Sequence, residues 1–189
     1  IKQSLESLGD QYSFIQDLTQ KVQAKDSLNL SLVMNLKRSL GNIADEDVKV
    51  EVRGGKVHIS IADRLLFASG SARLNDESQN VLNKIALVLN DHSELDVMVE
   101  GHTDSTPLGG GGRYNSNWEL SAARAASVAQ YLFIAPEMDE KRFMVVGHGS
   151  VRPLVDNKTA ENREKNRRVE IIIVKSGPKD NDDEPEIDT

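Results

Sequence analysis

The sequence predicts an α/β (α+β) fold, a two-layer sandwich with helices on one face of a mixed β-sheet, preceded by an N-terminal helical segment. Two runs of alternating apolar and polar residues flank the turn Gly54-Gly55, a pattern typical of a β-hairpin. Helical and strand-like patterns then alternate along the chain, which favours helices packed on one sheet. With 189 residues and 38% hydrophobic residues, the chain can bury a substantial core.

Three parts are expected: a helical segment at 1–44, a folded domain at 45–176 and a disordered acidic tail at 177–189. In the first part, apolar residues recur every three or four positions, as a narrow stripe. Such a stripe fits either a coiled-coil seam, which would make a homodimer possible, or a helix packed on its own domain. Asp26 is expected to cap a second helix that ends near Gly41. The residues of the stripe are Leu5, Leu8, Tyr12, Ile15, Leu18 and Val22.

Each element of the folded domain has its own signal. Valine and isoleucine alternate with polar residues in the hairpin strands, and two capping-box patterns mark helix starts, Asp76 with Gln79 and Ser116 with Glu119. The expected order is a hairpin of strands 48–52 and 57–61, a helix from Asp76, a strand at 96–100, a helix from Ser116 to about Phe133, and strands at 142–146 and 168–174.

The charge distribution argues against nucleic acid as a partner. The net charge is −7, but residues 178–189 hold six acidic residues and one lysine, so the tail carries −5 and the rest −2. A nearly neutral body has no basic surplus to replace phosphate counterions. The chain has no cysteine, which excludes disulfides and zinc thiolates. No apolar run approaches the roughly 20 residues of a membrane helix.

Opposite charges are expected to meet at one edge of the sheet. Asp104 follows a strand, and Arg124 lies on the next helix, on the same face as Asn117 and Leu120. A guanidinium matches a carboxylate with two hydrogen bonds, and an aspartate binds an ammonium. Two interpretations remain open at this point: a salt bridge between Asp104 and Arg124, or a recognition site for a ligand that carries both charges.

A metal site is a further alternative. His102, Asp104 and His148 could supply three nitrogen or oxygen ligands, enough for a catalytic zinc ion. Both histidines follow glycine at strand ends, where they can equally satisfy local backbone groups. Hydrolysis by a serine nucleophile is disfavoured because the chain has no G-x-S-x-G elbow.

Five ordered segments between about Val48 and Val174 resemble the OmpA-like peptidoglycan-binding domain. The long loop after Asp104, with its four glycines, is most similar to the flagellar stator subunit MotB and its non-flagellar relatives. The segments that carry the resemblance are Leu66-Phe67-Ala68-Ser69-Gly70-Ser71-Ala72, Glu100-Gly101-His102-Thr103-Asp104, Asn117-Trp118-Glu119-Leu120-Ser121-Ala122-Ala123-Arg124-Ala125, Gly147-His148-Gly149, and Asn162-Arg163 with Asn166-Arg167-Arg168-Val169-Glu170-Ile171.

The resemblance implies a non-enzymatic domain, without cofactor or metal, that binds the peptide stem of peptidoglycan through meso-diaminopimelate. It assigns the ligand's ammonium to Asp104 and its carboxylate to Arg124. The pocket lining it implies consists of Thr103, Asn117 and Leu120, with Arg167 or Arg168 close by.

The resemblance also implies a location in the periplasm, attached to the outer or inner membrane of a Gram-negative-type envelope. The chain opens Ile1-Lys2-Gln3 without an initiator methionine, so we expect a membrane anchor in a missing N-terminal segment. The protein would then tether a membrane or a membrane complex to the wall. Alternatives are a MotB-like stator or energy-transducing subunit and a metal-dependent wall-peptide hydrolase.

Overall fold

The computed structural model describes residues 2–109, 112–134 and 138–175. The predicted disorder of the tail at 177–189 lies outside these residues, as do the side chains of Leu5 and Leu8. Among the helices that are described, none combines the length and the apolar character needed to cross a membrane.

The sheet has five strands and is mixed, as the sequence predicts. Its spatial order is β1-β2-β5-β3-β4, in which β3 and β4 are parallel and the other neighbours are antiparallel. Gly54 and Gly55 form the hairpin turn with φ of 57° and 70°, a region that glycine adopts without steric cost. The strands are β1 (Val48–Arg53), β2 (Lys56–Ala62), β3 (Leu95–His102), β4 (Phe143–Gly147) and β5 (Arg168–Lys175).

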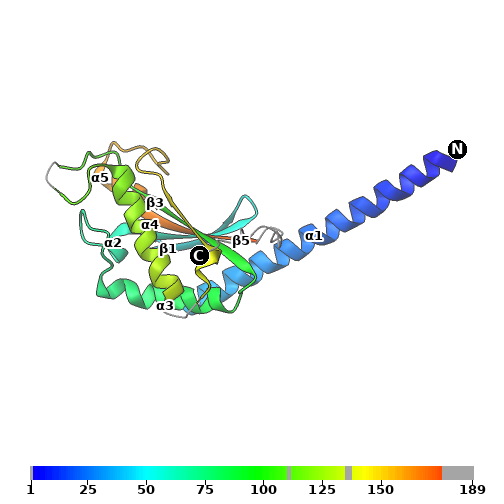
Figure 1. Cartoon of the computed structure of the whole chain (residues 1–189), viewed down its shortest axis with the longest axis horizontal. Coiled ribbons are helices and arrows are strands. Elements are labelled where there is room, and N and C mark those ends of the chain that lie inside the picture. Colours follow the sequence, from blue (N-terminus) through cyan, green and yellow to red (C-terminus); the bar gives the residue numbers. More distant parts are fainter. Residues whose placement is uncertain (1, 110–111, 135–137, 176–189) are drawn as a thin grey trace, which may run out of the picture.

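Three long helices pack on one face of the sheet, and the other face, called the open face below, carries none of them (Figure 1). The three are α1 (Lys2–Leu40), α3 (Asp76–Asn90) and α4 (Asn117–Ile134). The sequence did not indicate the short helices α2 (Asp63–Leu66) and α5 (Ala160–Asn166) or the 3-10 turn η1 (Glu140–Arg142). They are four, seven and three residues long, too short to show a helical period.

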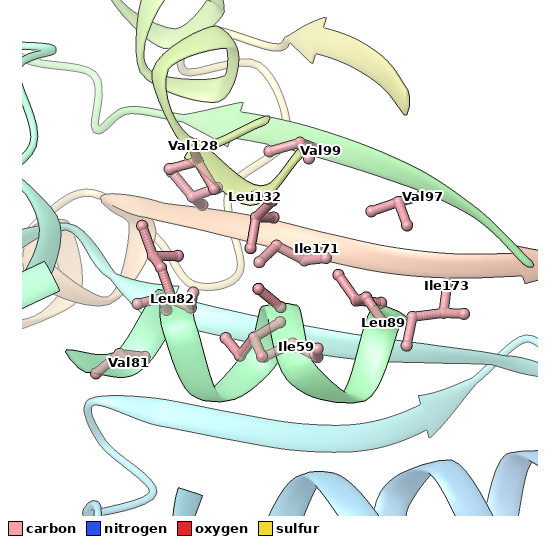
Figure 2. Packing of buried hydrophobic residues seen from close by; sticks show 14 of the residues in the cluster. Ile59, Val81, Leu82, Leu89, Val97, Val99, Val128, Leu132, Ile171 and Ile173 are labelled. Atoms are coloured by element: carbon pink, nitrogen blue, oxygen red, sulfur yellow. The ribbon is translucent and has the colours of Figure 1, made fainter. Parts of the chain in front are cut away.

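The core lies between this sheet face and the helices. Figure 2 shows side chains of β2, β3 and β5 meeting those of α3 and α4. Each such side chain contributes about 1.5–3 kcal/mol on burial, so this layer holds the strand edge and α4 in fixed positions. The labelled residues are Ile59, Val97, Val99, Ile171 and Ile173 from the strands, with Val81, Leu82, Leu89, Val128 and Leu132 from the helices.

The first helix is continuous, so the predicted break at Asp26 is wrong. No proline lies between Lys2 and Leu40, the nearest glycine before Asp26 is Gly9, and an exposed aspartate costs a helix interior only about 0.7 kcal/mol. Leu32, Leu36 and Leu40, each four residues apart, are buried against α3 and β1.

The N-terminal half of α1 projects away from the domain (Figure 1). Tyr12, Ile15, Leu18 and Val22 of the predicted stripe are exposed there. The homodimer that this stripe suggests stays a prediction.

Two helix starts differ in detail from the sequence prediction. Asn75, not Asp76, caps α3, and its Oδ1 accepts a hydrogen bond from Ser78 N at 2.8 Å. Asparagine and aspartate cap equally well, and the extended backbone of Asn75 suits the position. At α4, Ser116 Oγ accepts from Glu119 N at 3.2 Å, as expected, while Glu119 Oε2 accepts from Asn115 N at 2.9 Å.

Two paired glycines let α4 approach the ends of β3 and β4. Gly101 and Gly147 lie opposite each other in the parallel ladder. A Cβ atom at Gly101 would lie 2.0 Å from Ser121 O, and one at Gly147 would lie 2.7 Å from Ala122 N. This close contact fixes the part of α4 that carries Arg124.

Candidate functional site

A pocket lies at the edge where β2 and β3 end and β5 begins. Because β5 is antiparallel to both neighbours, the segments that follow β2 and β3 meet the residue before β5. Asp63 comes directly after β2, Asp104 is the second residue after β3, and Arg167 precedes β5; Asp63 N donates a hydrogen bond to Arg167 O at 3.0 Å. The pocket encloses about 630 Å³.

Six of the seven residues proposed from the sequence line this pocket, together with Asp63 and part of the loop after Asp104. The six are Thr103, Asp104, Asn117, Leu120, Arg124 and Arg167. Gly110 and Gly111 of that loop lie outside the described residues.

Asp104 is an ionised group at the pocket wall. Its Oδ2 lies 2.6 Å from Arg167 Nη1, and its Oδ1 accepts from Thr106 N at 2.7 Å. Burial alone would raise the pKa of Asp104, but the hydrogen bonds from Arg167 and Thr106 outweigh it and leave the pKa below its ordinary value of 3.8. Asp104 is therefore an anion at neutral pH.

Arg124 pairs with Asp63 rather than with Asp104. Its Nη1 lies 2.9 Å from Asp63 Oδ1, and its Nε donates to Ser71 O at 2.8 Å. The guanidinium also lies over the ring of Phe67, 5.1 Å from the centroid. Because each of the two residues has another partner, the simple Asp104–Arg124 bridge is replaced by two ion pairs in one pocket.

Asp63 is a buried charged residue of the pocket that the sequence analysis missed, and Arg64, Arg163 and Glu164 are further charged lining residues that it did not propose. Asp63 is 8% exposed, and burial raises its pKa, although Arg124 and Arg167 oppose the shift. The sequence did contain a signal: Asp63 directly follows an apolar strand, and Asp104 lies two residues after another. The sequence could not reveal that β2 and β3 both flank β5, which brings the two carboxylates to the same edge.

Two of the predicted lining residues also hold the loop in place. Asn117 Nδ2 donates to Asp104 O at 3.3 Å and to Thr106 O at 3.0 Å, and Thr103 Oγ1 donates to Asp104 O at 3.0 Å. These bonds keep the Asp104 backbone against the start of α4. Leu120, 3% exposed, supplies apolar wall.

Arg168 does not line the pocket, which corrects one of the two arginine assignments. It reaches the open face of the sheet, where its Nε lies 2.7 Å from Glu170 Oε1 and its Nη1 donates to Asn166 O at 3.1 Å. Arg167, one residue earlier, faces the pocket. Burial lowers the pKa of Arg168, which Glu170 partly offsets.

The metal alternative named the wrong carboxylate. His102 and His148 are neighbours, with ring centroids 4.9 Å apart, but Asp104 is held by Arg167 in the pocket. The acidic residue beside the two imidazoles is Glu100, on the open face.

Sequence relatives cover most of the domain. The chain is 39% identical over 145 residues to the uncharacterized protein YtxE of Bacillus subtilis (strain 168), covering 75% of this chain and 59% of that protein. It is 37% identical over 119 residues to motility protein B of the same organism, covering 63% of this chain and 45% of that protein. The chain thus spans about half the length of these relatives.

The fold is also found among solved structures. The cell wall anchor of the type VI secretion system of Pseudomonas aeruginosa superposes with a TM-score of 0.67 at 38% identity, covering 75% of this chain and 97% of that one. The model of the OmpA family matches residues 66–167, more than half of the chain and most of the pocket lining. The sequence match and the shared fold together show that this chain belongs to the OmpA family.

Proposed function

We propose that the pocket binds peptidoglycan non-covalently, through the diaminopimelate residue of its stem peptide. One observation carries the proposal: an anion, Asp104, and a buried cation, Arg124, line the same 630 Å³ pocket. The free end of meso-diaminopimelate carries an ammonium and a carboxylate on one carbon, so it needs both charges within one small site.

The two charges have distinct roles in this proposal. Asp104 accepts the ligand's ammonium, for which it is already ionised. Arg124 has about five N–H donors, of which the contacts with Asp63 and Ser71 use two, so others can bind the ligand's carboxylate. Asp63 keeps the guanidinium in place before the ligand arrives, and such preorganisation lowers the cost of binding.

Arg167 acts as an exchangeable partner. Its side chain is 37% exposed and neutralises Asp104 when no ammonium is bound. The ligand's ammonium would compete for the same carboxylate, leaving Arg167 to assist at the ligand's carboxylate. Exposed ion pairs are weak and screened by salt, so the affinity should be modest and should fall with ionic strength.

Known relatives support a wall contact. The structure at 38% identity is described as a cell wall anchor. We therefore propose a tether in the cell envelope, with the domain in the periplasm on the wall and a membrane attachment beyond α1. The helix is about 58 Å long at 1.5 Å per residue, so it can hold the domain away from a membrane.

A pull-down on purified sacculi tests the proposal. Wild type should co-sediment with sacculi, whereas Asp104→Asn and Arg124→Lys should not. Arg124→Lys retains a cation for Asp63 but lacks the planar fork, so the fold can survive while ligand geometry is lost. Asp91→Asn, an exposed aspartate next to α3, is the matched control and should bind normally.

A competition step identifies the ligand chemistry. Free meso-diaminopimelate should release the protein from sacculi, whereas Nα-acetyl-lysine amide, which presents an ammonium without a carboxylate, should not. Equal release by both would exclude the role given to Arg124. A folded wild type that does not bind sacculi would overturn the proposal, and release of soluble wall fragments would reveal a hydrolase instead.

A second candidate is a subunit of a membrane motor that uses the same wall contact. The similarity to motility protein B, at 37% identity, supports this candidate. A chimera in which this domain replaces the corresponding part of the Bacillus subtilis protein would test it. Restored swimming would support the motor role, and wall binding without swimming would favour a static tether.

A further inference from the structure

A cluster of three potential metal ligands lies on the open face of the sheet, apart from the pocket. Along β3, Leu95, Val97 and Val99 face the helices, so Glu100 and His102 face the other side. His148 follows β4, which is parallel to β3 and paired with it as far as Gly147. The ends of the two strands thereby bring both imidazoles to one carboxylate.

The spacing of these atoms is that of a tetrahedral metal site. Glu100 Oε2 lies 3.4 Å from His102 Nε2 and 3.3 Å from His148 Nε2. Ligands bound to zinc at 2.0–2.1 Å in a tetrahedron are about 3.3 Å apart. All three ligand atoms lie within 4.8 Å of one another, so a small rotation of one imidazole would complete the triangle.

Hydrogen bonding does not account for this arrangement. His102 is 3% exposed, yet neither of its ring nitrogens makes a hydrogen bond within the described residues, nor does His148 Nε2. The contacts with Glu100 are close enough but poorly aligned. Buried polar atoms are normally satisfied, so unpaired imidazole nitrogens directed at one carboxylate call for another partner.

The charges on the open face also favour a bound cation. Glu100 and Glu170 are directly opposed on β3 and β5, which is unfavourable for like charges. Glu170 has Arg168 and Arg53 as ion-pair partners. In the part of the chain that is described, the ion-pair partners of Glu100 are the two histidines alone. A cation between these three residues would balance Glu100.

We propose that Glu100, His102 and His148 bind one divalent transition-metal ion of the zinc type, with water as a fourth ligand. Two imidazoles and a carboxylate favour zinc and its neighbours over calcium or magnesium, which prefer oxygen ligands. The side chains of Glu100 and His148 are 14% and 11% exposed, which leaves the site a route to solvent. The bound ion would link the ends of β3 and β4, next to the loop that carries Asp104.

Zinc titration of the tag-free protein by calorimetry, with zinc chloride as the only added ligand, tests this site. Wild type should bind one zinc ion per chain, and the melting temperature should rise with zinc concentration. Glu100→Gln and His148→Gln should each lower the affinity by at least about tenfold. His58→Gln is the matched control: His58 lies on the same face beside Glu170, and its loss should leave zinc binding unchanged.

Cobalt provides a second readout that folding defects do not mimic. The cobalt-loaded wild type should show the intense visible absorption of a four-coordinate ion, and Glu100→Gln, which preserves side-chain shape, should abolish it. Absence of zinc binding by folded wild type would overturn the proposal. So would binding that survives Glu100→Gln and His148→Gln, or binding that His58→Gln removes. Sacculus binding by Glu100→Gln tests the pocket separately, because Glu100 does not line it.

Discussion

The pocket edge and the open face of the sheet each hold an arginine–carboxylate pair, and the pairs differ in burial. In the pocket, the side chains of Arg167 and Asp104 are 37% and 10% exposed. On the open face, those of Arg168 and Glu170 are 5% and 4% exposed. In a half-exposed ion pair, a ligand can replace one partner at a small cost in free energy. In a buried ion pair, loss of one partner leaves the other charge buried without a counter-charge, which is strongly destabilising.

The two arginines are consecutive, and strand geometry separates them. Arg168 is the first residue of β5, where successive side chains point to opposite faces of the sheet, and Arg167 precedes the strand at its edge. One pair therefore serves recognition in our proposal, and the other serves stability. Substitutions in each region test this contrast.

Gly101→Ala should have the largest effect because it disrupts both regions. The new Cβ would lie 2.0 Å from Ser121 O, so α4 must move away from β3, and Arg124 moves with it. We expect a loss of more than about 4 kcal/mol in unfolding free energy, an exceptional value for one substitution. Urea unfolding measures it, with Gly109→Ala as control, since a Cβ there meets no atom within 4 Å. Wild-type stability would show that α4 can shift without cost.

Arg168→Gln should separate stability from binding. It leaves the buried Glu170 with fewer cations, so we expect a loss of about 3 kcal/mol in unfolding free energy. Sacculus binding at a temperature where the variant is folded should match wild type. Arg152→Gln, on an exposed loop, should change neither quantity. Loss of binding in a folded Arg168→Gln would remove the distinction between the two regions.

Asp104→Asn should show the reverse pattern. The amide retains the shape and can still accept a hydrogen bond from Thr106 N, and the lost ion pair has one half-exposed partner, so the stability cost should be at most about 1 kcal/mol. Sacculus binding should nevertheless be lost, because the ligand's ammonium has no anion. If Asp104→Asn lowered the unfolding free energy as much as Arg168→Gln does, the main role of Asp104 would be to stabilise the fold rather than to bind the ligand.

The smallest effect is the pH dependence of the Asp104 contribution. Its pKa in the folded state is below the ordinary value of 3.8, so its ionised form favours the folded state. The difference in unfolding free energy between wild type and Asp104→Asn should be constant from neutral pH to about pH 5. It should disappear as the pH falls through the folded-state pKa. If the difference in unfolding free energy grew as the pH fell, the pKa of Asp104 would be raised in the folded state rather than lowered, which would contradict this prediction.

The strands and two of the long helices were readable because each has a local signal. The alternation of apolar and polar residues predicted the β-hairpin, and the capping-box patterns predicted the starts of α3 and α4 to within one residue. Asp26 shows the limit of such signals, because a residue that caps helices well is also tolerated inside one. The helix α2 is too short to show a helical period in the sequence, so neither α2 nor its first residue, Asp63, was predicted.

The order of residues was enough to predict the mixed α/β sandwich, the family resemblance, and a meeting of Asp104, Arg124 and an arginine near residue 167 at one edge of the sheet. Local periodicity and ordered motifs carry that information. The folded chain was needed to show that Arg124 pairs with Asp63, that Arg167 rather than Arg168 faces the pocket, and that Glu100 joins the two histidines. These outcomes depend on which strands are neighbours and which face each side chain takes, and residues distant in the sequence set both.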